Sequence, residues 1–275
     1  MKKKKNLLSL YIHWPYCISK CPYCDFNSHV NETVDIDLWI KSYTNQIYQM
    51  KEDIKKYNLN YDGLTSIFFG GGTPSLMPLR IIESILNSSL KVFNFNDNVE
   101  ISLEANPSSY ETKKFVDLKK LGVNRISIGA QSLNSRNLKF LGRLHNVNDI
   151  TRSLNHATKI FNNVSADLMY AFYGQDLDLW INELETFIKN FDLQHISLYQ
   201  LTIEKGTKFF TYYKRGVIQL MDDDLAADFY TKTNLILNNY NFNRYEVSNY
   251  SKLNFECKHN LSYWNSDNWI GIGPG

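Results

Sequence analysis

The stretch LSLYIHWPYCISKCPYCDFNSH, residues 8–29, decides the fold of this chain. It holds three of the four cysteines, Cys17, Cys21 and Cys24, in a C-x3-C-x2-C array. The apolar residues 7–14 are typical of a buried strand, so we expect the cysteines on the loop that follows it. Three neighbouring thiolates repel one another unless a cation compensates their charge, which indicates a metal centre. Structural zinc and protein-bound iron–sulfur clusters normally take four protein ligands, so three cysteines leave one position open for an exchangeable ligand.

Length and composition suit one large domain or one and a half, because the chain has 275 residues, of which 43% are hydrophobic, and α/β barrels routinely reach this size as a single unit. The net charge of +2 favours no polyanionic partner, and we expect no nucleic acid partner. Four lysines at 2–5 predict a solvated tail, and the apolar run behind them is too short for a transmembrane segment. Peripheral membrane contact stays open. The cysteine cluster and the lone Cys257 form no disulfide framework, which predicts a cytoplasmic protein.

Apolar periodicity predicts a regular alternation of strands and helices along the chain. This alternation implies parallel strands with crossover helices, hence an α/β sheet or barrel whose chemistry lies at the carboxyl ends of the strands. A capping box at Ser108 and Glu111 is expected to open the third helix. The predicted strands are 7–14, 64–69, 99–105, 125–129, 164–170, 195–201 and 243–247. The predicted helices are 35–57, 78–92, 108–121, 147–161, 176–191 and 222–240.

Two segments at these strand ends are candidates for ligand contact. Gly70 to Pro74 reads GGGTP, and glycines lack the Cβ that keeps a backbone away from a ligand, although a plain flexible turn is the alternative. Glu104 ends a buried strand, and a buried carboxylate needs a partner, such as a basic residue lining the barrel.

The cysteine spacing, with Tyr23 directly before the third cysteine, resembles the signature of the radical S-adenosylmethionine (SAM) superfamily. The flanking segments YIHWPYC and CPYCDFNSH resemble the sequences of one branch of this superfamily, which contains the oxygen-independent coproporphyrinogen III oxidases and the HemW-type haem chaperones. The resemblance implies a partial (β/α)6 TIM-type barrel over residues 1–240. It implies that residues 241–275 begin a truncated C-terminal region, with the usual C-terminal domain shortened or missing. The alternative from spacing alone is a zinc knuckle completed by His13, Asp25 or His29.

The resemblance also implies the cofactors and their ligands. The three cysteines would hold a [4Fe-4S] cluster, and the glycine motif would contact the methionyl amino group of SAM. A carboxylate can accept from ribose hydroxyls or an ammonium, and a guanidinium can fork to a carboxylate. Further SAM contacts are implied at residues of the motifs IGAQS, LGRLH and ADLMY and at two tyrosines near the cofactor. The full implied set for SAM is Tyr11, Tyr23, Gly71, Gly72, Thr73, Glu104, Gln131, Arg143 and Asp167.

Late in the chain, residues 257–264 read CKHNLSYW. They resemble an HNxxYW motif that is associated with haem handling in the HemW-type chaperones. This implies a haem contact at His259, since histidine is a common axial ligand and aromatic rings suit a porphyrin face. Without the resemblance, a lone histidine beside aromatic residues is usually a packed or surface residue.

Two differences from the oxidases favour the chaperones. Oxidases of this class carry a fourth cysteine where this chain has Phe26, and they have a long N-terminal extension, whereas the first cluster cysteine here is Cys17. We therefore expect a haem chaperone that passes haem to an acceptor protein, with respiratory-chain haemoproteins as candidates. The alternatives are a coproporphyrinogen III oxidase of porphyrin biosynthesis and an inactive shortened relative. Whether the chain is an enzyme stays open, and no catalytic residue is assigned.

Overall fold

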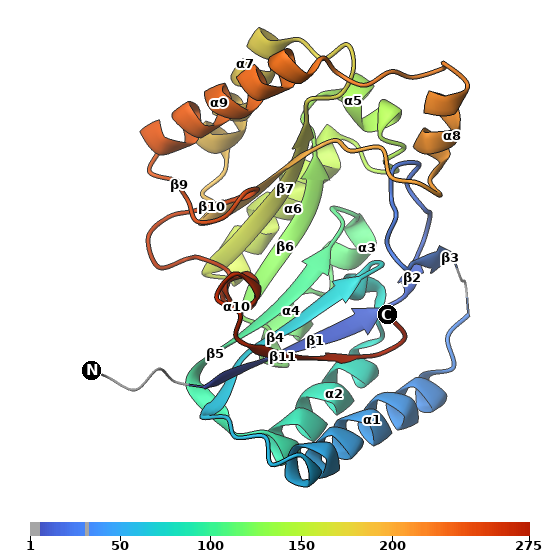
Figure 1. Ribbon diagram of the computed structural model, residues 1–275, viewed down its shortest axis with the longest axis vertical. Helices are drawn as coiled ribbons and strands as arrows, with labels where there is room; N and C mark the ends of the chain where they lie inside the picture. The colour runs from blue at the N-terminus through green and yellow to red at the C-terminus, as the bar shows by residue number, and fades with distance from the viewer. Residues whose placement is uncertain (1–5, 31–32) are drawn as a thin grey trace.

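A computed structural model describes residues 6–30 and 33–275; the predicted lysine tail lies outside the described residues. Its centre is a nine-stranded sheet in the order β11-β1-β4-β5-β6-β7-β8-β10-β9 (Figure 1). From β1 to β8 neighbouring strands are parallel and follow one another along the chain, so the sheet curves as an open barrel. These strands are β1 (Leu7–Trp14), β4 (Gly63–Gly71), β5 (Phe95–Ala105), β6 (Arg125–Gln131), β7 (Asn163–Tyr170) and β8 (His195–Gln200).

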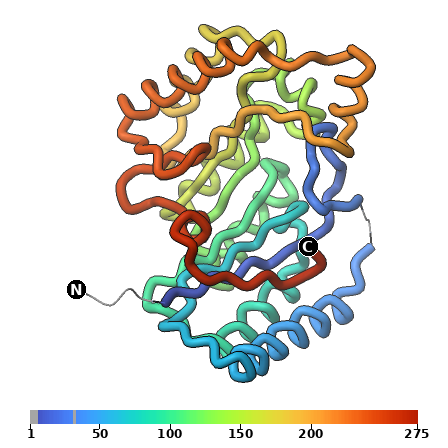
Figure 2. The backbone as a smooth tube through the Cα atoms, in the orientation of Figure 1, coloured from blue at the N-terminus to red at the C-terminus, as the bar shows by residue number. Residues whose placement is uncertain are grey.

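The two edges of the sheet come from the end of the chain. β11 (Asn268–Ile272) runs parallel to β1, so the last residues lie beside the first strand (Figure 2). At the other edge, β10 (Asn249–Ser251) and β9 (Asn243–Arg244) are antiparallel, which corrects the expectation of parallel strands throughout. The predicted division at residue 240 stays a prediction, and the strands that follow it pair into the same sheet.

The long helices pack on the outer face of the sheet, with α1 and α2 below it and α7 and α9 above it in Figure 1. The prediction of one continuous helix at 108–121 was wrong, because the structure has two short helices there, α3 and α4. Short elements that lack two full turns of apolar pattern escaped prediction. The helices are α1 (Ile36–Lys56), η1 (Pro74–Leu76), α2 (Leu79–Val92), α3 (Ser109–Thr112), α4 (Phe115–Lys120), α5 (Ser135–Phe140), α6 (Val147–Ile160), α7 (Leu177–Asn190), α8 (Lys208–Lys214), α9 (Asp223–Asn239) and α10 (Lys258–Trp264).

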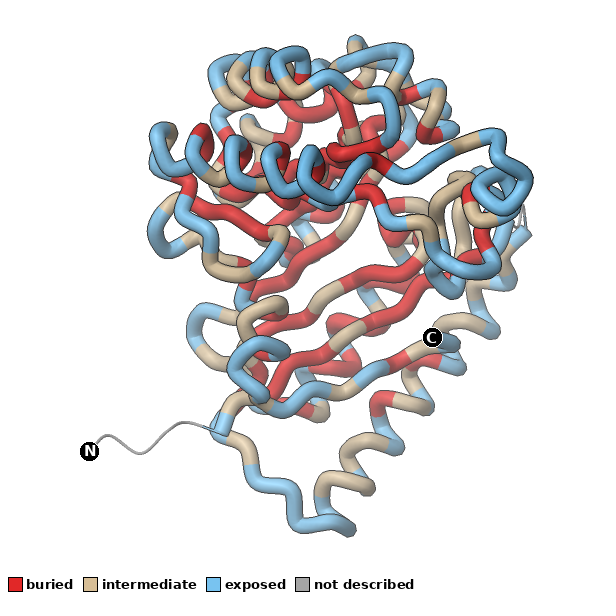
Figure 3. Tube along the Cα trace, turned by 45° about the horizontal axis from the view of Figure 1, so that its top comes forward, coloured by how far each residue is buried: buried red, intermediate tan, exposed pale blue. Residues whose placement is uncertain are grey.

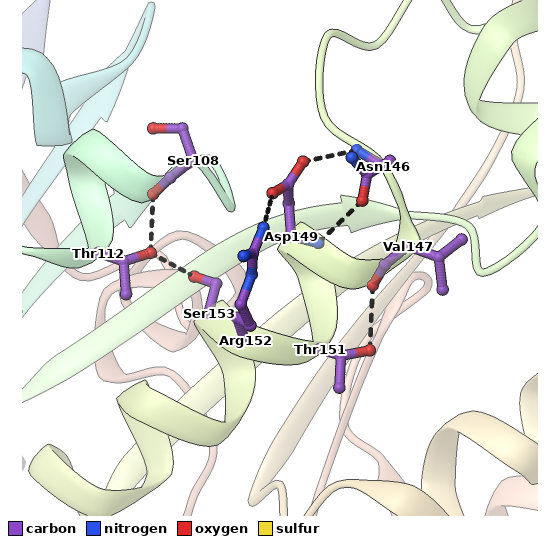
Figure 4. Close-up of polar contacts among 8 residues, drawn as sticks. All are labelled: Ser108, Thr112, Asn146, Val147, Asp149, Thr151, Arg152 and Ser153. Carbon is purple, nitrogen blue, oxygen red and sulfur yellow. Dashed lines mark hydrogen bonds and ion pairs between the residues drawn. The ribbon is translucent and has the colours of Figure 1, made fainter.

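Side-chain caps define several helix starts. Asn146 and Asp149 form a reciprocal capping box at the start of α6, and Thr112 Oγ1 donates to Ser153 at 3.2 Å, which ties α3 to α6 (Figure 4). The Ser108 side chain caps α3 as predicted. The carboxylate of Glu111, however, accepts from the backbone N–H of Asn106 at 2.7 Å and from the Ser75 hydroxyl, so it ties the end of β5 to η1.

The strands alternate between an apolar outer face and a polar inner face. In β1, Leu10 and Ile12 are fully buried in the core under the helices, where Figure 3 shows the strands as buried segments. On the inner face Ser9 Oγ lies 2.8 Å from Ser66 Oγ, and Ser165 Oγ lies 2.7 Å from His195 Nδ1. TIM-type barrels usually fill their interior with branched aliphatic residues. The polar lining here therefore leaves an interior suited to a polar ligand.

Among the helices of the described residues, none has the length and apolar character to cross a membrane.

Candidate cluster and cofactor site

The predicted loop carries the three cysteines at the carboxyl end of β1. Short strands β2 (Tyr16–Cys17) and β3 (His29–Val30) pair at its base, and the backbone N–H of Cys24 donates to the carbonyl of Cys21 at 3.1 Å. All three thiols are free and half-buried. Burial raises the pKa of Cys17, and the charges of the neighbouring cysteines raise it further. A hydrogen bond from Thr73 lowers the pKa and opposes part of this rise. A bound cation would therefore be needed to keep this thiol ionised at neutral pH.

A single metal ion and a four-iron cluster require different spacings of their ligands. Within residues 6–30 and 33–275, no three His, Cys, Asp or Glu side chains are gathered closely enough for one ion. Tetrahedral zinc, with Zn–S bonds of about 2.3 Å, needs sulfurs roughly 3.8 Å apart. A four-iron cluster bonds each cysteine to a separate iron, so its ligands stand farther apart. His13, one candidate for a zinc knuckle, is buried, and its Nε2 lies 2.9 Å from the carbonyl of Asn27.

Arg143 lies against the cysteine loop from the segment after α5. Its Nη1 is 3.3 Å from Cys21 Sγ and 3.3 Å from the Tyr23 hydroxyl, and its Nη2 donates to the side chain of Asn106 and, at 3.2 Å, to the carbonyl of Gly129. Cations beside a thiolate favour its ionised form. The structure thus brings together two predicted SAM residues and one predicted cluster ligand.

Asn106 completes this network, and the sequence analysis missed it. Its Nδ2 donates to Thr73 Oγ1 at 3.1 Å, and Thr73 Oγ1 donates to Cys17 Sγ at 3.4 Å. A single side chain at the end of β5 therefore connects the partners of two cysteines. The motif LEANP could have indicated Asn106, because an amide has both a donor and an acceptor for such a bridge.

The glycine segment is packed against the start of the cysteine loop. The backbone N–H of Gly72 donates to the carbonyl of Trp14 at 2.6 Å. A Cβ on Gly72 would lie 2.8 Å from the carbonyl of Tyr16, and Gly71 has a positive φ of +110°. Glycine is thus required by the close approach of the chain to itself. The predicted contact of this segment with SAM stays a prediction.

A cavity of about 210 Å3, here called the loop cavity, opens between these parts; its lining includes Cys21, Thr73, Asn106, Arg143 and His145. Gln131 occupies the left-handed region at φ 69°, where a bulge ends β6. A Cβ on Gly129 would lie 2.9 Å from Gln131 Nε2 and 3.4 Å from Arg143 Nη2. Gly129, another residue that the sequence analysis missed, therefore leaves room for both side chains.

A second cavity of about 160 Å3, here called the central cavity, lies inside the barrel; its lining includes Tyr11, Glu104, Arg125, Asp167 and His259. Burial, and then the charge of Asp167, raise the pKa of Glu104 to about 8, although Arg125 and the backbone of Gly71 lower it. Burial also raises the pKa of Asp167 against hydrogen bonds from Ser197 and Ser127. Arg125 is the kind of barrel-lining basic residue expected beside Glu104. Five of the nine predicted SAM residues therefore line a cavity: Thr73 and Arg143 line the loop cavity, and Tyr11, Glu104 and Asp167 line the central cavity.

His259 lies at the base of the central cavity on α10 and is only 2% exposed. Its Nδ1 is 3.0 Å from Ser66 Oγ, its Nε2 is 2.9 Å from the Tyr263 hydroxyl, and its ring stacks on Phe68 at 5.0 Å. Burial, and then the charge of Arg125, lower the pKa of His259 to about 4. The imidazole is therefore neutral at physiological pH. Both nitrogens are engaged, so an iron atom would have to displace one partner.

Cys257 also lines the central cavity, apart from the three loop cysteines. It is 1% exposed, and its Sγ lies 3.4 Å from Glu100 Oε1. Burial raises the pKa of this thiol to about 12 against the opposing charge of Arg125. A protonated, enclosed thiol is a poor metal ligand.

Comparison with known proteins shows which family this chain belongs to. The model of a family described as the radical SAM superfamily matches residues 11–186. The chain belongs to this superfamily and, within it, to the family of the HemW-like proteins, as the resemblance predicted.

Its similarity to two curated HemW proteins covers almost the whole chain. It is 39% identical to "Heme chaperone HemW" of Buchnera aphidicola and 37% identical to that of Escherichia coli, over 98% of this chain and 69% of each relative. It is 38% identical to the mitochondrial "Radical S-adenosyl methionine domain-containing protein 1" of Danio rerio, over 97% of this chain. This chain spans only 59% of that relative's length.

Among solved structures, coproporphyrinogen III oxidase (HemN) of Escherichia coli superimposes with a TM-score of 0.79. The match covers 98% of this chain and 64% of that one at 20% identity. It therefore supports the fold alone, and the predicted partial barrel is confirmed.

Proposed function

We propose that this protein is a haem chaperone that binds a SAM-ligated [4Fe-4S] cluster and haem and transfers haem to an acceptor protein. The observation that carries the proposal is that α10, with its HNxxYW motif, forms a wall of the same barrel interior that Glu104 and Asp167 line. The names of the HemW relatives support the same reading. A cytoplasmic location and respiratory-chain haemoproteins as acceptors belong to this proposal.

The donors around the loop cavity fit the cluster and the amino-acid end of SAM. Cys17, Cys21 and Cys24 would hold three irons, and Arg143 would bind the methionyl carboxylate through its planar fork. When bound, the cluster supplies a redox-active iron with one position free for SAM. Gly71 and its neighbours would receive the amino group, with Tyr23 and Gln131 beside the cofactor.

The central cavity fits the remainder of SAM. Each cavity, at about 160 and 210 Å3, is smaller than the roughly 300 Å3 at which pockets for drug-sized ligands begin, and the proposal assigns one SAM molecule to both. The carboxyl groups of Glu104 and Asp167 would take the ribose hydroxyls, with Tyr11 opposite them. Because burial holds the pKa of Glu104 at about 8, this side chain can donate as well as accept at neutral pH.

Haem would contact the outer side of α10. Tyr263, Trp264 and Trp269 are 42%, 58% and 53% exposed, and the rings of Tyr263 and Trp269 are 5.4 Å apart. Large exposed aromatic side chains are suited to a porphyrin face. His259 would reach the iron only after the Tyr263 hydroxyl releases its Nε2, and this release is part of the proposal.

The test is a haem titration of the anaerobically reconstituted chain, followed by its Soret band. We expect His259→Ala to weaken haem binding or shift the band while the cluster absorbance is unchanged. His156→Ala, a histidine of α6 outside both cavities, is the matched control. Equal haem spectra for the wild type and His259→Ala would remove the histidine from the proposal, and absence of haem binding would remove the chaperone function.

The second candidate function is oxygen-independent coproporphyrinogen III oxidation. The polar central cavity favours it as a place for a substrate, but Phe26, which is 59% exposed on the cysteine loop, can neither ligate metal nor transfer a proton. Sustained formation of protoporphyrinogen in an anaerobic assay would establish the oxidase and overturn the chaperone.

A further inference from the structure

A half-buried carboxylate on an outer helix reaches the loop that follows β6. Glu183 belongs to α7, and its Oε1 accepts hydrogen bonds from the hydroxyl of Ser132 and, at 2.6 Å, from the backbone N–H of Leu133. In the described part of the chain, no Lys, Arg or His lies within ion-pair distance of Glu183. Burial raises the pKa of this carboxyl group, although the hydrogen bonds from the loop lower it. Its partners are therefore the loop and not a counter-ion.

Ser132 extends this hold to the first turn of α5. Its Oγ accepts from the backbone N–H of Asn134 at 3.0 Å and from Asn137 Nδ2 at 3.2 Å. Asn134 in turn caps α5, since its Oδ1 accepts from the backbone N–H of Arg136 at 2.9 Å. A serine hydroxyl has a single proton and two lone pairs. With two donors on its oxygen, Ser132 needs an acceptor for that proton, and Glu183 is the acceptor.

Two residues predicted to bind SAM lie at the two ends of this segment. Gln131 directly precedes Ser132 and has a φ of 69°. A left-handed conformation of a residue other than glycine persists only where neighbouring contacts hold it. Arg143 follows α5, and its backbone N–H donates to the carbonyl of Leu138 at 2.9 Å, so its position depends on that of the helix. Glu183 therefore supports both positions from outside the two cavities.

The same arrangement occurs on the other side of Arg143. Glu111, which is 1% exposed, accepts from the Ser75 hydroxyl and, at 2.7 Å, from the backbone N–H of Asn106. The side chain of Asn106 accepts from Arg143 Nη2. In both places a serine hydroxyl and a backbone N–H meet on one carboxylate oxygen. Two carboxylates thus fix the supports of the same guanidinium.

We infer that Glu183 is a positioning residue for SAM, which holds residues 131–143 so that Gln131 and Arg143 meet the cofactor together. This inference rests on the proposed function. Outer partners that orient metal ligands contribute about 10- to 100-fold to metal affinity, and binding side chains gain their precision from support of this kind. Because both hydrogen bonds end on one oxygen, the amide oxygen of a glutamine can accept them as well. The loop needs the acceptor and not its charge.

The experiment measures SAM affinity by calorimetry on the anaerobically reconstituted chain. We expect Glu183→Ala to weaken SAM binding about tenfold while the iron–sulfur absorbance is unchanged. Glu183→Gln should bind SAM like the wild type. Leu184→Ala, at the next and fully buried position of α7, lowers stability by leaving a cavity and should keep the wild-type affinity.

Ser132→Ala is the second variant, because it removes the same link from the side of the loop. It should weaken SAM binding to the same degree as Glu183→Ala. The double variant should be no weaker than either single variant, since residues that act through one hydrogen bond are not additive. Additive losses would overturn the inference.

Hydrogen–deuterium exchange on the cluster-free chain measures the positioning itself. Amides of residues 131–143 should exchange faster in Glu183→Ala than in the wild type, while those of residues 101–112 are unchanged. Wild-type SAM affinity in Glu183→Ala, an equal loss in Leu184→Ala, a glutamine variant as weak as the alanine variant, or unchanged exchange at 131–143 would each overturn the inference alone. A wild type that binds no SAM fails at the proposed function, and the inference falls with it.

Discussion

The loop cavity and the central cavity are lined by five of the nine residues predicted to bind SAM, but the chain builds the two cavities differently. The loop cavity is lined by residues 18–149, and its main side chains stand in motifs that the sequence displays openly. The central cavity needs both ends of the chain, because α10 reaches it through contacts such as that between Ser9 and Ser262, 253 positions apart. The first is therefore tied to local motifs and the second to closure of the barrel. Variants in each should fail in different ways.

The largest expected difference is between the loop cysteines and the cavity cysteine. Cys21→Ala should abolish the iron–sulfur absorbance after anaerobic reconstitution, because two thiols cannot hold a four-iron cluster. Cys257→Ala should retain full absorbance, since this thiol is enclosed beside Glu100 and its pKa is raised by burial to about 12. Tetrahedral zinc without iron in the wild type would contradict both expectations.

A loss of SAM affinity without loss of the cluster is expected from Gly129→Ala. The added Cβ would lie 2.9 Å from the Gln131 amide nitrogen, so that side chain would have to move, and it would lie 3.4 Å from Arg143 Nη2. We expect SAM affinity to fall about tenfold, which is roughly 1.4 kcal/mol, in calorimetry on the reconstituted protein. Gly271→Ala is the control, because its Cβ would have 3.5 Å to the nearest side chain. An unchanged affinity would separate Gly129 from the cofactor site.

The buried carboxyl group of Glu104 in the central cavity should make the free energy of unfolding depend on pH. The folded pKa of Glu104, about 8, lies above its ordinary value of 4.5, so the folded chain keeps a proton that the unfolded chain releases between these values. The free energy of unfolding should therefore fall as pH rises through this window, by at most about 1.4 kcal/mol per pH unit. Glu104→Gln should remove the contribution of Glu104 to this slope in urea unfolding curves at several pH values, while the raised pKa of Asp167 keeps its own contribution. If exposed Glu204→Gln removed it equally, the cavity would not be its source.

The smallest expected effect belongs to Thr73→Val, which keeps the shape of the side chain but removes its hydrogen bonds to Cys17 and Asn106. We expect the cluster to assemble with a shifted reduction potential and the chain to lose about 0.5–1.5 kcal/mol of stability. Potentiometric titration and chemical unfolding measure the two effects. Thr158→Val, at a half-buried position of α6 outside both cavities, should leave the reduction potential unchanged.

The fold was largely predictable because its strands and helices repeat in a regular order. The predicted strand at 7–14 has the bounds of β1, and the predicted helix at 147–161 differs from α6 by one residue. Short helices and the antiparallel edge were missed, since seven residues of α10 hold too little periodic pattern to indicate a helix. Tertiary packing stabilises such elements, and no local propensity reveals that packing.

The sequence by itself determined the superfamily, the barrel and the three-cysteine loop, because spacing and apolar periodicity are local properties of a chain. Only the tertiary structure decided that Asn106 and Gly129 support Arg143, and that His259 lies buried against Ser66 with both nitrogens engaged. The physical reason is that these contacts join residues far apart in the chain. Their geometry exists only after the strands have paired and the last helix has packed against the first strand.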